Sequence, residues 1–150
     1  MINEITWKDG EQKVQEYMKK LGFKILLTNF SCVGVELDIV SILPKKEQIE
    51  KLKIETKQKV KRDRKNRSIY VNSLKSMLNN LDDLLVITEV KARANVKFGL
   101  GLESISDYKK HNLIRGARYL QTQQQFEKYQ IRFDVASVDK GEITYIENAF

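Results

Sequence analysis

The sequence is poor in the residues that cross-link or break a fold. Its 150 residues include one Cys, Cys32, and one Pro, Pro44. A single Cys excludes an internal disulfide and argues against a zinc site, so we expect Cys32 to be a small residue in a loop. The chain is hydrophilic, but its single Pro shows that it does not have the composition of a Pro-rich linker.

Long apolar runs are absent as well. No stretch approaches the length that crosses a bilayer, and residues 1–12 lack the basic start and apolar run of a signal peptide. We therefore expect a cytoplasmic protein without a membrane partner. A hydrophobic fraction of 41% suits a globular protein, and 150 residues suit one domain, residues 1–150.

Acidic residues are scarce in the middle of the chain. Residues 44–81 hold twelve Lys or Arg and four Asp or Glu, a net +8, whereas the whole chain has a formal net charge of +7. All the excess positive charge therefore lies in this segment. Such a block usually binds an anionic partner or forms a solvated face, and nucleic acid is the expected partner. A membrane surface would require stronger aromatic or Leu-rich amphipathicity.

Periodicity and turn residues predict an α/β domain built on one mixed sheet. Residues 44–82 are expected to form a basic helical arm, inserted between the second and third strands. The expected elements are a helix over 9–21 capped by Asp9, strands over 23–30 and 35–43, helices from Pro44 to about residue 65 and over 69–81, a strand over 84–92, a loop over 95–104, a helix over 106–130, a strand over 131–138 and a short strand within 140–150.

Two of the predicted strands have acidic residues in unusual places. Alternation in 35–43 places Leu37 and Ile39 on one face, and Glu36 and Asp38 on the other. Two acids on one face of a strand that is otherwise apolar require an explanation.

In the strand over 84–92, Glu89 and Lys91 are two residues apart and so share a face. If the two strands are neighbours, Asp38, Glu89 and Lys91 converge. Carboxylates of this kind can bind Mg²⁺, and a Lys beside them can orient or deprotonate a water, or stabilise a leaving oxygen. Spacing alone also allows a solvent-exposed ion pair, which would stabilise the fold by roughly 0–1 kcal/mol.

The surrounding motifs extend the pattern. "GVELDIV" followed by "VITEVKAR" resembles the PD-(D/E)xK motif of the restriction-endonuclease-like nucleases. "GEQKVQEYMKKLGFKIL", "FGLGLESISDYKKHNLIRGARYL", "IRFDVASV" and "ITYIENAF" resemble, in the same order, segments of the YraN-like family of predicted endonucleases. Archaeal Holliday-junction resolvases are similar in their acids and ExK strand. The resemblance covers nearly everything except residues 44–82, and it implies a restriction-endonuclease-like αβββαβ core.

The resemblance also implies roles for individual residues. Asp38 and Glu89 match the metal-binding acids, and Lys91 matches the catalytic Lys. Glu11 matches an early acid facing the metal, although it could equally complement the dipole of the first helix. Glu36 matches an extra acid before the Asp, and its alternative is a solvated strand residue.

Basic residues are assigned to nucleic-acid contacts. Lys109 matches a basic residue at the start of the long helix and would touch phosphate, unless it belongs with Arg115 and Arg118 to a solvated helix face. The candidates for nucleic-acid binding are Lys109, Arg115, Lys57, Lys61, Arg62, Arg64 and Lys65.

The resemblance therefore implies a Mg²⁺-dependent endonuclease, with Mn²⁺ as a substitute, acting on structured or branched DNA. The alternative is a nucleic-acid-binding or scaffold protein that keeps the fold without turnover. We expect DNA ahead of RNA as the partner, and the related resolvases make a homodimer an option. One departure stands out: the family joins the Asp strand to the ExK strand by a tight hairpin, whereas residues 39–88 separate Asp38 from Glu89 here. The segment could grip nucleic acid, cover the cleft, solubilise the protein or serve as an oligomer contact.

Overall fold

A computed structural model of the chain describes residues 7–93 and 105–150, and the loop expected over 95–104 lies outside them. Its elements are α1 (Trp7–Lys20), β1 (Lys24–Cys32), β2 (Val35–Leu43), α2 (Lys45–Arg62), a 3₁₀ turn η1 (Arg64–Asn66), α3 (Arg67–Asn79), β3 (Leu84–Arg93), α4 (Asp107–Gln121), β4 (Gln130–Asp139) and β5 (Glu142–Ile146). The expected α/β class and the order of the elements are confirmed.

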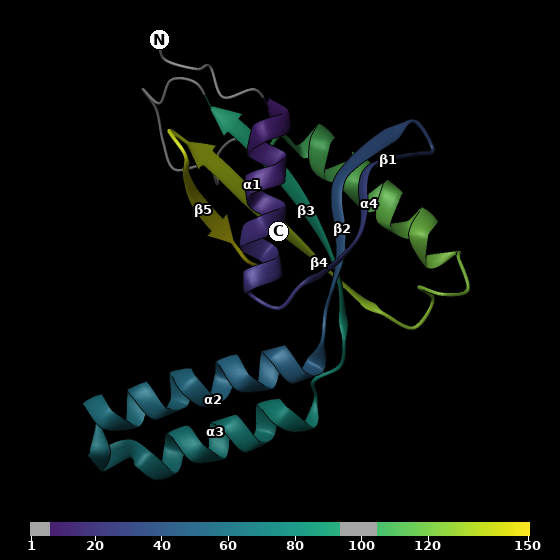
Figure 1. Cartoon of the computed structure of the whole chain (residues 1–150). Coiled ribbons are helices and arrows are strands. Elements are labelled where there is room, and N and C mark those ends of the chain that lie inside the picture. The colour runs from purple at the N-terminus through teal and green to yellow at the C-terminus, as the bar shows by residue number, and fades with distance from the viewer. Residues whose placement is uncertain (1–6, 94–104) are drawn as a thin grey trace.

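One mixed sheet organises the domain. The strands lie in the order β1-β2-β3-β4-β5, with β3 and β4 parallel and every other pair antiparallel. Helices α1 and α4 cover opposite faces (Figure 1). This arrangement gives β3 two hydrogen-bonded neighbours and a helix over each face, as its nearly continuous apolar start requires.

The core has one cluster on each side of the sheet. Val14 and Met18 of α1 pack against Ile39 and Val86 on one face. Leu113, Ala117 and Leu120 of α4, the buried face expected from the sequence, pack with Leu37 and Ile87 on the other. The same central strands thus contribute alternate side chains to both clusters.

The expectation for Leu37 and Ile39 was wrong, because the two residues belong to opposite clusters. Residues Thr28 and Phe30 pair with Ile39 and Leu37 across the β1–β2 ladder, and the intervening Asn29 has a φ of 48°. The alternation of β2 therefore changes face at Asp38, opposite Asn29, without a change of register there; the register shift of this ladder lies between Ile25 and Leu27.

Three local expectations also differ from the structure. Helix α4 ends at Gln121 instead of continuing to residue 130, because the Thr122 hydroxyl donates to the Tyr119 carbonyl and Phe126 folds back into the core. Helix α1 begins at Trp7, so Asp9 lies in its first turn and does not cap it. Cys32 is the buried last residue of β1, not a loop residue.

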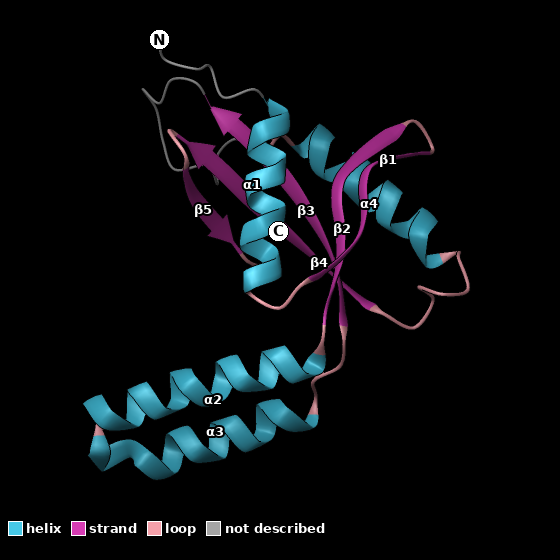
Figure 2. Ribbon diagram, in the orientation of Figure 1, coloured by secondary structure: helices cyan, strands magenta, loops and turns pink. Residues whose placement is uncertain are grey.

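The basic segment forms two helices, as expected. Helices α2 and α3 run side by side and leave the sheet between β2 and β3 (Figures 1 and 2). None of their residues is buried. We call residues 45–79 the arm. No helix among residues 7–93 and 105–150 is long and apolar enough to cross a membrane.

Candidate active site

The candidate site lies where β2 and β3 separate. Their ladder runs from Leu43–Leu84 to Ile39–Thr88, and the next residues are Asp38 and Glu89. The Asp38 carboxylate Oδ2 accepts a hydrogen bond from the Val90 backbone N–H at 2.8 Å. The side chain therefore takes the place of a main-chain partner at the point where the ladder stops. We call this point the fork.

Glu89 is the most perturbed acid at the fork. Glu89 is 8% exposed, and its Oε1 lies 3.2 Å from the Lys109 Nζ. Its buried Oε2 has no hydrogen-bond partner among the described residues. Burial and the neighbouring Asp38 charge raise the pKa of Glu89 to about 7, against the opposing effect of Lys109. At neutral pH this carboxyl group is therefore poised between its two protonation states.

Glu11 and Glu36 extend the negative charge on the α1 side. The Glu11 carboxylate accepts a hydrogen bond from the Asn29 side chain at 3.0 Å. Burial raises the pKa of Glu11, as do the charges of Asp38 and Glu36, and the Asn29 hydrogen bond opposes them. Asp38 thus influences the titration of Glu11 as well as that of Glu89. Glu36 itself is exposed.

The basic residues expected at the site separate into two groups. Lys109 reaches Glu89 from α4, and Lys91 is half-buried two residues beyond Glu89 on β3. Because side chains alternate along β3, Lys91 shares the α4 side of the sheet with Glu89. Arg115 lies on the exposed side of α4. The structure places Lys57, Lys61, Arg62, Arg64 and Lys65 on the arm, which begins at the other end of the β2–β3 ladder.

The donor set of the fork fits a hard divalent cation. Mg²⁺ prefers carboxylate oxygens and commonly takes one or two of them, keeping water elsewhere. Asp38 supplies one carboxylate, and Glu89 supplies a buried oxygen that lacks a donor. No three His, Cys, Asp or Glu side chains gather as a ready-made metal cluster in the part of the chain that the structure describes. A cation here would therefore depend on water and substrate for its remaining ligands.

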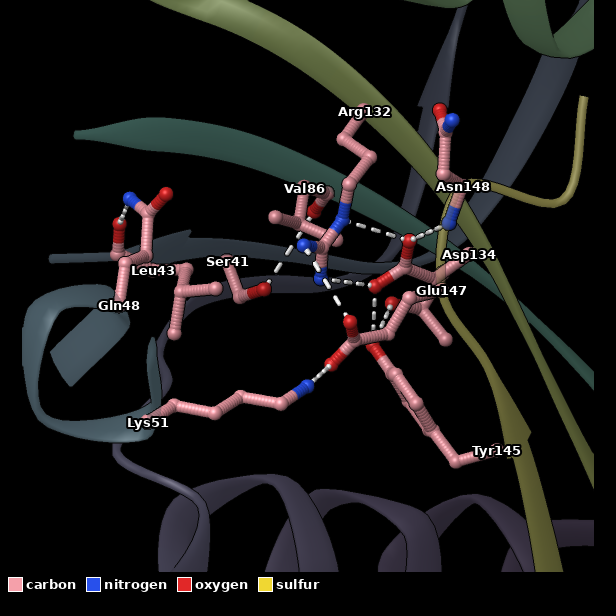
Figure 3. A network of polar contacts seen from close by, with 11 residues as sticks. Ser41, Leu43, Gln48, Lys51, Val86, Arg132, Asp134, Tyr145, Glu147 and Asn148 are labelled. Atoms are coloured by element: carbon pink, nitrogen blue, oxygen red, sulfur yellow. Dashed lines mark hydrogen bonds and ion pairs between the residues drawn. The ribbon is translucent and has the colours of Figure 1, made fainter. Parts of the chain in front are cut away.

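The sequence places Asp134 in a buried strand with a local partner, but it does not predict the wider polar network around Asp134 on the α1 side of the sheet (Figure 3). Asp134, 1% exposed, accepts two hydrogen bonds from the Arg132 guanidinium, one from the Tyr145 hydroxyl and one from the Asn148 backbone. Burial and the Asp134 charge raise the pKa of Tyr145. The Tyr145 hydroxyl also lies 3.2 Å from the hydroxyl of Thr88, the residue before Glu89. The one signal in the sequence was an acid within the apolar strand "IRFDVASV".

Comparison with known proteins identifies the family. The sequence model of the family described as "Uncharacterised protein family UPF0102" matches residues 10–138. The chain belongs to the UPF0102 family. The match spans α1, both strands of the fork and α4, so all the candidate site residues lie inside it.

Relatives in the UPF0102 family match most of the chain. A UPF0102 protein of Legionella pneumophila is 41% identical over 146 residues, which cover 95% of this chain and 92% of the relative. A UPF0102 protein of Persephonella marina is 26% identical over 150 residues, covering 100% and 97%.

One UPF0102 relative is clearly shorter. The protein of Francisella tularensis subsp. novicida is 39% identical over 69 residues, covering 45% of this chain and 59% of the relative. Because 69 residues make up 59% of it, that relative has about 117 residues, against 150 here.

Proposed function

We propose that this UPF0102 protein is a divalent-metal-dependent endonuclease that hydrolyses phosphodiester bonds in structured or branched DNA. The observation that carries the proposal is the fork, where Asp38 and the buried, partly unpartnered Glu89 meet at the end of a strand ladder. Acids on two diverging strands with a Lys two residues further on support a restriction-endonuclease-like arrangement, in which the arm is an insertion.

Asp38 and Glu89 would hold the cation, with Glu11 and Glu36 adding negative charge on the α1 side. A bound Mg²⁺ supplies a Lewis acid and a bound water of lowered pKa. The hydrogen bond from the Val90 N–H fixes the Asp38 carboxylate before any substrate arrives.

The two lysines have distinct roles in this proposal. Lys91, on the same side of β3 as Glu89, orients the attacking water or takes its proton. Lys109 lies 3.2 Å from Glu89 and holds that carboxylate until a phosphate enters, then donates to the phosphate oxygens. Lys109 also offsets the negative charge of the acids, which alone would repel an anionic substrate.

The test is incubation with linear, single-stranded and four-way-junction DNA in Mg²⁺ or Mn²⁺. We expect cutting of the junction, with Asp38→Asn, Glu89→Gln and Lys91→Gln each lowering the rate by on the order of 100-fold. Glu127→Gln, an exposed acid in the turns after α4, is the matched control. Failure to cut any DNA, or variants that cut as fast as wild type, would refute the proposal.

A second candidate is a nucleic-acid-binding or scaffold protein without turnover. It is favoured by the lack of a ready-made metal cluster among the described residues. Isothermal titration with Mn²⁺ separates the two functions. Binding that is lost in Asp38→Asn supports the enzyme, whereas DNA binding without any Mn²⁺ binding supports the scaffold.

A further inference from the structure

The arm presents a row of lysines to solvent. Lys53, Lys57 and Lys61 are exposed and recur every four residues along α2, so successive ammonium groups advance about 6 Å along the helix. This step is close to the separation of neighbouring phosphates on one nucleic-acid strand. Like charges at this spacing weaken a helix by a few tenths of a kcal/mol each. If the lysines served only to solubilise the arm, we would expect acidic residues to alternate with them. Of the three lysines, Lys53 has an acid nearby, Glu50, whose carboxylate lies 3.6 Å from the Lys53 ammonium.

The far end of the arm concentrates the charge further. Residues 57–67 contain seven Lys or Arg and a single acid, Asp63. The Asp63 Oδ2 accepts hydrogen bonds from the Asn66 side chain at 2.8 Å and the Tyr70 hydroxyl at 3.0 Å, which lowers the Asp63 pKa. This acid therefore holds the turn between the helices. In the described part of the chain, no carboxylate lies within ion-pair distance of the seven basic side chains.

Helix dipoles do not explain these positions. Basic residues in the last turn of α2 do complement its dipole. Arg67, however, is the first residue of α3, and Arg64 and Lys65 lie in η1 directly before it, where positive charge is unfavourable. The arrangement costs helix stability and creates an uncompensated cationic surface.

The base of the arm is fixed to the sheet. The Gln48 side chain donates to the carbonyl oxygens of Leu43 and Asp82, and the Lys51 ammonium lies 2.6 Å from the Glu147 carboxylate (Figure 3). Glu147 in turn lies 4.0 Å from the Arg132 guanidinium of the buried network. These contacts give the arm a defined direction instead of leaving it as a tether.

That direction is away from the fork. The arm leaves the sheet at Leu43–Leu84, five ladder pairs below Asp38 and Glu89, and projects outward (Figure 1). The ladder spans roughly 15 Å and α2 about 27 Å, which places the tip on the order of 30 Å from the fork. The arm therefore does not cover the cleft. Its basic end reaches a point about one turn of duplex DNA away.

We propose that the arm is a second DNA-binding element, which grips the phosphate backbone of a B-form duplex about one helical turn from the fork. Its distance from a cleavage point rests on the proposed function, but the grip itself does not. A helix carrying lysines fits the major groove of B-DNA, whereas the major groove of A-form RNA is too narrow. Single strands are a poor fit, because Tyr70 is the arm's one aromatic residue and its hydroxyl is bound to Asp63.

The test is fluorescence anisotropy with a labelled DNA duplex of about three helical turns, in EDTA so that no cleavage occurs, over a range of NaCl concentrations. The arm variant is Lys57→Gln/Lys61→Gln/Lys65→Gln in the full chain. The control is Lys19→Gln/Lys24→Gln/Lys128→Gln, which removes the same charge from exposed lysines of the core. Circular dichroism checks that both remain folded.

We expect the arm variant to reduce the slope of log K against log [NaCl] by about 2 to 3, since each lost phosphate contact contributes about 0.9. The control should change the slope by less than about one contact. An unchanged slope in the arm variant, or an equal reduction of the slope in the control, would refute the proposal that the arm binds the phosphate backbone. Tighter binding of an RNA duplex or a single strand of the same length would overturn the assignment to B-form DNA. Because EDTA prevents cleavage, a failure of the nuclease proposal leaves these results unaffected.

Discussion

At the scale of single residues, the ionised form of Glu89 destabilises the folded protein, because the carboxyl group is buried beside Asp38. Its pKa is raised from 4.5 to about 7 by burial and by Asp38. In the metal-free protein the folded state therefore keeps a proton that the unfolded state releases between these values. Stability should fall as pH rises through this window and reach its low plateau above it.

Glu89→Gln removes this dependence. In EDTA at about pH 8 we expect the variant to be more stable than wild type by on the order of 2 kcal/mol, with little difference at about pH 5. Urea unfolding at the two pH values measures both differences, and Glu127→Gln is the exposed control. Stability curves of wild type and Glu89→Gln that run parallel across this range would contradict the raised pKa.

Asp134 has the opposite character, because it is buried and fully satisfied. Asp134→Ala would leave Arg132 and the Tyr145 hydroxyl without their acceptor. We expect a loss of about 3–5 kcal/mol in urea unfolding. The double variant Arg132→Met/Asp134→Leu should lose less, since no buried charge remains unpaired. A single variant that loses less than about 1 kcal/mol would show that the network does not stabilise the fold.

Glu89 and Asp134 show which features of single residues can be predicted from the sequence and which cannot. Glu89 and Lys91 could be placed on one face from spacing alone, and Asp38 could be matched to them by motif. The contact between Lys109 and Glu89 required the docking of α4, which no local pattern encodes. Asp134 was visible as an acid in an apolar strand, but its partners Tyr145 and Asn148 come from the chain end.

At the scale of elements, the two ends of the arm segment connect to residues that pair with each other in the sheet. Leu43 and Leu84 lie opposite each other at the end of the β2–β3 ladder, and no residue of α2 or α3 is buried. A two-residue turn can join antiparallel strands at such a pair. The sheet therefore does not need the arm in order to form.

Replacing residues 44–83 by Asn-Gly should leave a folded core. We expect a shift in Tm of no more than a few degrees, because the lost contacts are exposed or half-buried. Thermal unfolding followed by circular dichroism measures the shift. A variant that is unfolded, or that melts more than about 15 °C lower, would mean that the arm is part of the core.

Elements were predictable where one local rule acts alone. The end of β2 follows from Pro44, and the buried face of α4, formed by Leu113, Ala117 and Leu120, follows from helical spacing. The end of α4 was missed, because "TQQQFEKYQ" continues the helical composition while Phe126 is drawn into the core. The change of face at Asp38 was missed, because nothing in "VELDIVSIL" marks a break in strict alternation.

At the scale of the whole molecule, the acids of the fork and the cations of the arm lie at opposite ends of one ladder. The chain order had suggested that the basic segment would lie between the two halves of the site. The strands instead return to pair from Leu43–Leu84 to Ile39–Thr88, so the segment projects from the far end. Under the two proposals, substrate attraction and chemistry would therefore be separated in space.

This separation predicts a division of kinetic effects. If the nuclease and arm proposals both hold, Lys57→Gln/Lys61→Gln/Lys65→Gln should raise KM by about tenfold or more at about 150 mM NaCl and leave kcat within about twofold, because the arm binds ground state and transition state alike. Asp38→Asn should do the reverse, lowering kcat with little change in KM. Steady-state cleavage of a junction with duplex arms longer than one turn measures both. A fall in kcat in the arm variant would instead place the arm at the reacting phosphate, which its distance from the fork argues against.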